Sequence, residues 1–296
     1  MPAGTASALR ERDAELLLEV LAPLVTAHAG SLQAADKRLL FEAAREAIPD
    51  HAQAVDFAVE LSRRKEPIAK QLAASLCLSH TAAFDDLADE ILGVLEATAD
   101  DENWEVRETA GGAVGALLVR RPDAAAVVLR RWSRSPSERL RRAVVLAVKY
   151  AARDVPGKAE ELLDLVEPLA ADGSEYVRKN LGPFALGDGL LPRAPEATLS
   201  RLRAWSKSRD EWVRWNVAMA FTAAAARPHA REALPILRVV AGDERPRVQR
   251  AVVKALANLA VAQRAAVLSA VSSWGEDPAR RAAAAAVRGR LSGRRA

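Results

Sequence analysis

A chain of 296 residues with a formal net charge of +4 is half hydrophobic but only 4% aromatic, and alanine dominates its long stretches. Strong helix formers prevail and runs of β-branched residues are missing, so the composition predicts an all-α protein. The polar, charged N-terminus excludes a signal peptide, and no stretch looks long and apolar enough to cross a membrane, so we expect a cytoplasmic protein.

Taken in chain order, residues 1–64 are expected to form a helical N-terminal cap, and residues 65–290 repeat a common pattern. Six segments each place small or apolar residues at i, i+4, i+7 and i+8, counted from the residue before a shared arginine-like position. They predict helices that start at residues 104, 138, 175, 211, 246 and 277, with a weaker copy from Pro67. The arginine-like positions are Arg107, Arg141, Arg178, Arg214, Gln249 and Arg280, separated by 34, 37, 36, 35 and 31 residues.

These helices are the second members of helix pairs and are called second helices below. The first helices of the pairs lie between them, and several start beside proline or aspartate, as helix starts often do. They are predicted at residues 87–99, 122–132, 158–170, 195–205, 233–242 and 263–274. Helix pairs repeating every 31–37 residues predict a HEAT-like α-solenoid, in which stacking builds the continuous core that no single pair can make. No linker interrupts the chain, so we expect one domain over residues 1–296 with a short basic C-terminal tail.

Several conspicuous residues fit packing better than chemistry. Trp132, Trp205 and Trp274 close equivalent first helices, so we expect them in the core. The single cysteine, Cys77, lies in an apolar run with no histidine motif nearby and is expected to be buried. The four histidines are scattered without metal-ligand spacing, so neither a metal nor a cofactor is expected.

The charge changes sign abruptly along the chain. From Phe84 to Glu108 there are ten carboxylates and one arginine, whereas from Arg120 to Arg153 there are ten Lys or Arg residues and two acids. Any one of these charges fits a solvated helix face. The switch as a whole predicts a positive surface beside a carboxylate-bearing one.

Two residues break the repeat at the helix that starts at residue 104. Trp104 stands where the other copies have Glu138, Glu175, Glu211, Pro246 and Asp277. Glu108 stands where they have Arg142, Lys179, Trp215, Arg250 and Arg281. Cations at the starts of neighbouring second helices suit phosphates, and a single acid among them suggests chemistry. The alternative is that Glu108 is favoured only by the helix dipole.

Residues 65–260 resemble the HEAT-like alkylpurine DNA glycosylases, the bacterial AlkD and AlkC superfamily. Within NWEVRE, Trp104 and Glu108 resemble the tryptophan and aspartate of the family's Trp-x-x-x-Asp stretch, and Arg142 in RLRRAVVLAVKY resembles its groove arginine. Two features depart from the family. Pro183, followed by Phe184, replaces a second groove tryptophan of the AlkD branch, and the Asn-His pair of the AlkC branch is absent. Asp188, between two glycines, is expected to end its helix early.

The resemblance implies a DNA N-glycosylase that removes positively charged N3- or N7-alkylated purines from duplex DNA. Glu108 would stabilise the positive charge that develops on the deoxyribose and would position water, as carboxylates do in glycoside hydrolysis. Trp104 would pack its face against the sugar. Arg142, Lys179 and Arg107 would hold phosphates, and the wider predicted DNA-binding set adds Arg141, Arg178, Arg214 and Trp215.

Two other functions remain open on the sequence. One is a DNA-binding solenoid without enzymatic activity, which would suit the loss of the second aromatic wall. The other is a protein-interaction scaffold whose acidic stretch before Glu108 forms the partner surface. The favoured hypothesis is a monomer that acts on double-stranded DNA with alkylated bases, binds no membrane or metal, and associates with the nucleoid when bound.

Overall fold

The computed structural model describes residues 1–293, so Arg294, Arg295 and Ala296 of the predicted basic tail lie outside the described residues. Every regular element in the described range is a helix, which confirms the all-α prediction. The chain forms two compact units, Met1–Val128 and Leu129–Ala296. The prediction of a single domain over residues 1–296 stays a prediction.

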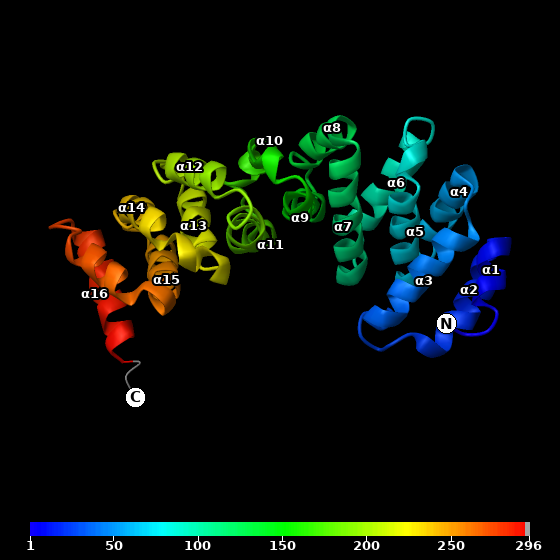
Figure 1. Ribbon diagram of the computed structural model, residues 1–296, viewed down its shortest axis with the longest axis horizontal. Helices are drawn as coiled ribbons and strands as arrows, with labels where there is room; N and C mark the ends of the chain where they lie inside the picture. The colour runs from blue at the N-terminus through cyan, green and yellow to red at the C-terminus, as the bar shows by residue number, and fades with distance from the viewer. Residues whose placement is uncertain (294–296) are drawn as a thin grey trace. The chain divides into compact units, whose positions relative to one another are not determined.

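The first unit begins with short helices and continues in antiparallel pairs, in which α5 packs against both α4 and α7 (Figure 1). The boundary between the units falls inside α8. The helices up to this point are α1 (Thr5–Glu11), α2 (Ala14–Leu21), η1 (Ala22–Leu24), α3 (Ala34–Ala47), α4 (His51–Ser62), α5 (Pro67–Ser79), η2 (Thr81–Ala83), α6 (Ala88–Ala99), α7 (Trp104–Arg120) and α8 (Pro122–Trp132).

The second unit repeats the same pairing. Its elements are α9 (Glu138–Asp154), η3 (Pro156–Lys158), α10 (Ala159–Val166), η4 (Glu167–Leu169), α11 (Glu175–Asn180), η5 (Leu181–Leu190), α12 (Pro195–Trp205), α13 (Glu211–Ala220), η6 (Ala224–His229), α14 (Ala230–Val240), α15 (Pro246–Ser272) and α16 (Pro278–Ser292). The predicted starts at residues 104, 138, 175, 211 and 246 are confirmed, and the last helix begins one residue later than predicted.

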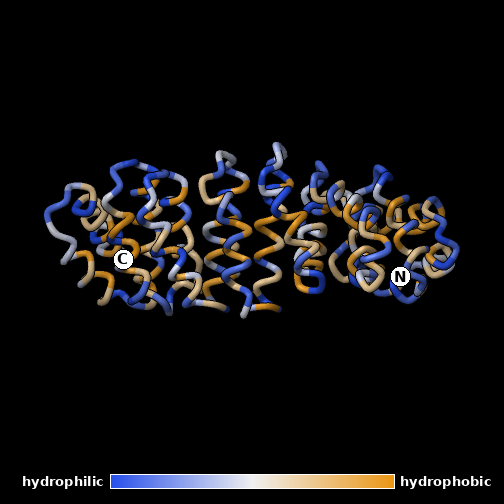
Figure 2. Tube along the Cα trace, turned by 90° about the horizontal axis from the view of Figure 1, so that it is seen from above, coloured by the Kyte–Doolittle hydropathy of each residue, from blue (hydrophilic) through white to orange (hydrophobic). Residues whose placement is uncertain are grey.

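Hydrophobic and hydrophilic stretches alternate along the helices in each unit, as amphipathic helices in packed pairs require (Figure 2). The predicted packing role of the three tryptophans is confirmed, because Trp132, Trp205 and Trp274 are at most 7% exposed. Cys77 is fully buried, also as predicted. Burial raises the pKa of its thiol to about 12.

A hydrogen-bonded loop precedes each second helix from α7 to α15, and the shared arginine-like side chain closes it. That side chain donates to the backbone carbonyl six residues earlier, at 2.5–2.9 Å. The side chain of the same loop residue also accepts a hydrogen bond from the backbone N–H of the residue that caps the helix. These loop residues are Asp101, Ser135, Asp172, Ser208 and Asp243.

The three loop aspartates also bind a cation from the preceding second helix of their own unit. Asp101 pairs at 2.6 Å with Lys70, which stands at the arginine-like position of α5. Asp172 pairs with Arg141 at 2.6 Å, and Asp243 pairs with Arg214 at 3.2 Å. Each aspartate therefore links one helix pair to the next.

The helix that contains Asp188 does not end early, so that expectation was wrong. After α11 the chain continues as a π-helix, η5, through Pro183 and Asp188, and the N–H of Leu191 donates to the carbonyl of Leu186 at 2.9 Å. The glycines have a packing role here. A Cβ on Gly187 would lie 2.4 Å from the Ala220 carbonyl oxygen, so only a glycine allows η5 to pack this closely against α13.

The expectation that no stretch is long and apolar enough to cross a membrane was also wrong for the described residues. By length and composition alone, α15 qualifies, with a mean hydropathy of 1.4 over its most apolar window. It is broken at Gln263, whose φ of −133° and ψ of 52° are not helical. It therefore consists of the second helix of one pair followed directly by the first helix of the next pair. Its apolar side packs against α13, α14 and α16.

Candidate nucleic-acid interface

The start of α7 presents Trp104 to solvent. The Asn103 side chain caps this helix by accepting the N–H groups of Glu105 and Val106 at 2.9 and 3.4 Å. Val106 is completely buried and fixes the helix on the core, whereas Trp104, two residues earlier, is 49% exposed. About half of this large indole is therefore accessible at a capped and anchored helix start.

Trp104 and Glu108 lie on the same side of α7, because residues four apart in a helix stack one above the other. Glu108 is half-buried on the first turn and a half of the helix. The two residues therefore share one face of α7, and their place in a common basic groove stays a prediction.

A loop near the N-terminus reaches the same helix start. The ring of His28 meets the indole of Trp104 edge to face, with 5.4 Å between the ring centroids and an interplanar angle of 67°. The Nδ2 of Asn103 donates to the carbonyl of Ala29 at 2.7 Å. The sequence prediction treated residues 1–64 only as a cap and missed this contribution.

Glu105 lies at the centre of a polar cluster formed by side chains of α3, α5 and α7. It forms an ion pair with Lys37 and accepts a hydrogen bond from Gln71 at 3.3 Å. Burial would raise the pKa of Glu105, but the hydrogen bonds from Lys37 and Gln71 outweigh it and hold the pKa below its ordinary value. The carboxylate is thus fixed in its charged form, and it holds Lys37 close to the start of α7.

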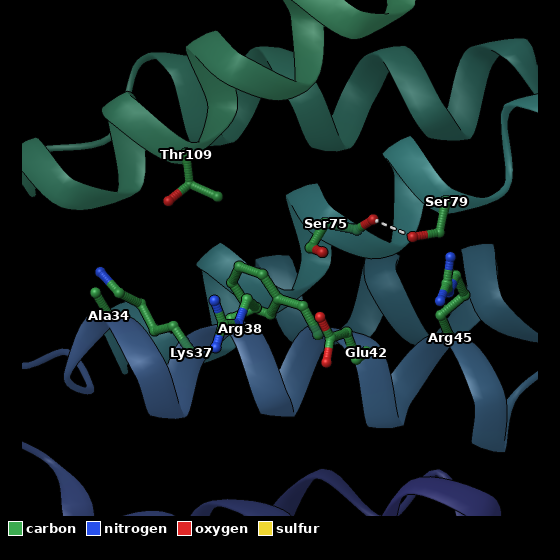
Figure 3. A pocket seen from close by; sticks show the side chains of 9 residues that line it. Ala34, Lys37, Arg38, Glu42, Arg45, Ser75, Ser79 and Thr109 are labelled. Carbon is green, nitrogen blue, oxygen red and sulfur yellow. Dashed lines mark hydrogen bonds between the residues drawn. The ribbon is translucent and has the colours of Figure 1, made fainter.

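Lys37 also lines a groove of about 470 Å³ bounded by α3, α5 and α7. In Figure 3 the α3 side chains point across the groove towards α5 and α7. Cations and hydroxyl groups dominate its lining, with one carboxylate among them. The lining residues are Ala34, Lys37, Arg38, Phe41, Glu42, Arg45, Ser75, Ser79 and Thr109. This combination suits an anionic, hydrogen-bond-accepting ligand such as a phosphodiester.

The four shared arginines predicted to bind DNA are committed to the fold. Arg107, Arg141, Arg178 and Arg214 close the repeat loops through the carbonyl bonds described above. Arg178 is only 6% exposed, and its guanidinium lies 3.5 Å from the centre of the Trp212 ring. Their role in phosphate binding stays a prediction, and their bonds point instead to a structural role.

The residues that follow these arginines in the second unit are more accessible. Arg142 is half-buried, with its guanidinium carbon 4.9 Å from the centre of the Tyr176 ring. Lys179 is exposed and pairs with Glu175 at 2.8 Å. Trp215 is half-buried on the first turns of α13. A groove shared by Trp104, Glu108 and Arg142 would join the two units, and it stays a prediction.

The segment that replaces the second groove tryptophan is the π-helix η5. Phe184 is half-buried there, and the ammonium of Lys149 from α9 lies 2.7 Å from the centre of its ring. A cation over the ring face is favourable, and it covers that face of Phe184. The sequence analysis identified Pro183 and Phe184 but did not predict that Lys149 would cover the ring of Phe184.

Two histidines that the sequence left scattered meet in the first unit. The Nδ1 atoms of His51 and His80 lie 2.9 Å apart, and His80 is 3% exposed. Burial, and then the nearby His51, lowers the pKa of His80. Among residues 1–293 no three His, Cys, Asp or Glu side chains gather in a way that could hold a metal ion.

Comparisons with solved structures identify the fold. Kap121p bound to Ste12p resembles this chain with a TM-score of 0.50 at 16% identity, and the match covers 97% of this chain and 34% of Kap121p. The chain therefore spans about a third of the length of that protein. YibA of E. coli gives a TM-score of 0.37 at 15% identity, over 96% of each chain. The likeness to Kap121p confirms the predicted HEAT-like solenoid fold.

Comparisons of sequence identify the family. No curated protein matches the chain. Residues 30–184 and 183–289, however, match the family described as DNA alkylation repair enzyme. These two ranges include most of each unit, with α7, η5 and the groove bounded by α3, α5 and α7. The chain belongs to the DNA alkylation repair enzyme family.

Proposed function

We propose that this protein is a DNA N-glycosylase that excises positively charged N3- or N7-alkylated purines from duplex DNA. Its family supplies the general task, alkylation repair, and DNA as the partner. The single observation that carries the finer proposal is the pair on α7, the exposed Trp104 with Glu108 one helical turn behind it.

The chemistry needs little beyond this pair. An alkylated purine already carries a positive charge, so when the C1′–N bond breaks, its electron pair leaves with a base that becomes neutral. Positive charge then develops on the deoxyribose, and the carboxylate of Glu108 stabilises it. Water adds to C1′ and gives up a proton, which completes the hydrolysis. The indole of Trp104 offers its electron-rich face to the cationic sugar.

The α3 groove supports DNA as the ligand of this surface. Arg38 and Arg45 are exposed, seven residues apart on α3, and therefore project from the same side of the helix. Their spacing is roughly 10 Å along the helix axis at 1.5 Å per residue. Two guanidinium groups and the hydroxyls of α5 and α7 would bind backbone phosphates beside the reacting nucleotide.

A direct test is release of 7-methylguanine and 3-methyladenine from duplex DNA, measured with protein in excess. Glu108→Gln removes the charge but keeps the size, so excision should fall by about 10²–10³-fold, the scale of losing one electrostatic stabiliser. DNA affinity should hold or rise, because an anion that faces phosphates is gone. Glu108→Asp restores the family residue and should retain measurable activity.

A second candidate function is DNA binding without catalysis, which the covered face of Phe184 favours. In that case the wild-type protein binds duplex DNA in a salt-dependent manner but releases neither base. Equal excision by wild type and Glu108→Gln would instead assign Glu108 to the helix start and remove it from the site.

A further inference from the structure

The loop between η1 and α3 is closed on itself in an unusual conformation. Both the N–H and the hydroxyl of Thr26 donate to the carbonyl of Ser31, at 2.8 and 2.9 Å. Inside it, Ala29 and Gly30 follow one another with φ of 56° and 61°. A residue with a Cβ rarely adopts this left-handed region, and it does so where the surrounding structure enforces it.

Three contacts hold the loop against α5 and α7. The carbonyl of Ala29 accepts from Asn103 at 2.7 Å. The hydroxyl of Ser31 donates to Gln71 at 2.6 Å, and both side chains are completely buried. Gln71 in turn donates to the carbonyl of Glu105 at 3.2 Å. The loop is therefore fixed to the residues on both sides of Trp104.

The consequence is that His28 stands beside Trp104 while remaining open to solvent. Its side chain is 73% exposed, although the ring contacts the indole edge to face. Its Nε2 lies 3.8 Å from Glu105, which already has a closer cation in Lys37. The constrained loop therefore holds the imidazole beside Trp104 while most of its surface stays accessible.

We propose that His28 is a second substrate-contacting side chain, which forms with Trp104 a two-walled corner for the deoxyribose of the damaged nucleotide. The inference rests on the proposed function and extends it to a residue outside the repeats. The two planar rings meet at 67°, so a sugar placed against the indole face would have the imidazole at its side.

The first test measures binding and needs no catalysis. The probe is a duplex that contains a tetrahydrofuran abasic-site analogue, and its affinity is compared with that of the undamaged duplex. His28→Ala should lower the preference for the abasic duplex on the order of 10-fold, the scale of losing one aromatic contact to a nucleotide. His28→Tyr restores a planar wall and should stay within about 3-fold of wild type. His229→Ala, a histidine of the second unit, should change nothing.

The second test is single-turnover release of 7-methylguanine by the same variants, with helix content and melting temperature checked by circular dichroism. Loss in His28→Ala and recovery in His28→Tyr support the two-walled corner. If His28→Ala matches wild type in both assays, the proposal is overturned. It is equally overturned if folded His28→Tyr is as defective as His28→Ala, or if the wild type shows no preference for the abasic duplex. A His28-dependent preference without release of either 7-methylguanine or 3-methyladenine would refute the proposed glycosylase function and leave the corner intact.

Discussion

The contact between η5 and α13 makes Gly187→Ala the most demanding test of the fold. The added Cβ would lie 2.4 Å from the carbonyl oxygen of Ala220 and 2.8 Å from the Cβ of Ala223. Ordinary contacts between carbon and oxygen are about 3.3 Å or longer, so the backbones must separate by roughly 0.9 Å. Both partners are main chain or the first side-chain atom, and no rotamer change can relieve the clash.

Overpacking of this kind costs about 1–3 kcal/mol, and we expect the upper end because main chain must move. At about 2–4 °C per kcal/mol, the melting temperature should fall by roughly 6–12 °C. The assay is urea and thermal unfolding followed by circular dichroism. Gly93→Ala is the matched control, because Gly93 sits inside α6 with nothing within 4 Å of its added Cβ. That variant should be stabilised by about 0.5–1 kcal/mol. A Gly187→Ala protein as stable as wild type would refute the tight packing of the π-helix.

Three further outcomes are expected. Arg38→Ala or Arg45→Ala should each reduce the slope of log affinity for duplex DNA against log salt by about one, as for one lost phosphate contact. Arg63→Ala, an exposed arginine outside the groove, should leave that slope unchanged. Burial lowers the pKa of His80 below 6.5, so below that pH the unfolded chain binds a proton that the folded chain does not. The free energy of unfolding should therefore fall between about pH 7 and pH 5.5, by at most about 1.4 kcal/mol per pH unit, and less in His80→Leu. Cys77 should resist thiol reagents in the native protein and react on unfolding, because burial raises its pKa to about 12.

The helical fold could be predicted from the sequence because each second helix carries its own apolar periodicity. The segment from Pro195 to Trp205 was placed with its observed bounds. The π-helix could not be predicted in this way. Two glycines around Asp188 are a common reason for a helix to end, and only the proximity of α13 to Gly187 and of α9 to Gly189 shows that they serve close packing instead.

The candidate site was partly visible in the sequence. Trp104 and Glu108 stand out because they break the repeat, whereas the shared arginines were assigned to DNA because arginine suits phosphates. A signal against that assignment was present. Asp101, Asp172 and Asp243 each lie six residues before the arginine-like position, and they reveal an internal bond once the copies are aligned. His28 carried no such signal, since its partner is 76 residues further along the chain.

The constant loop before each second helix also governs how the chain can vary in length. Arginine-like positions in the second unit are 37, 36 and 35 residues apart from Arg141 to Gln249, yet the bond back to the loop carbonyl always spans six residues. Insertions and deletions are therefore absorbed elsewhere, in the first helices and in short turns such as η3, η4 and η6. Repeats can therefore differ in length while the side chains at the starts of the second helices keep the same position relative to the loop that precedes them.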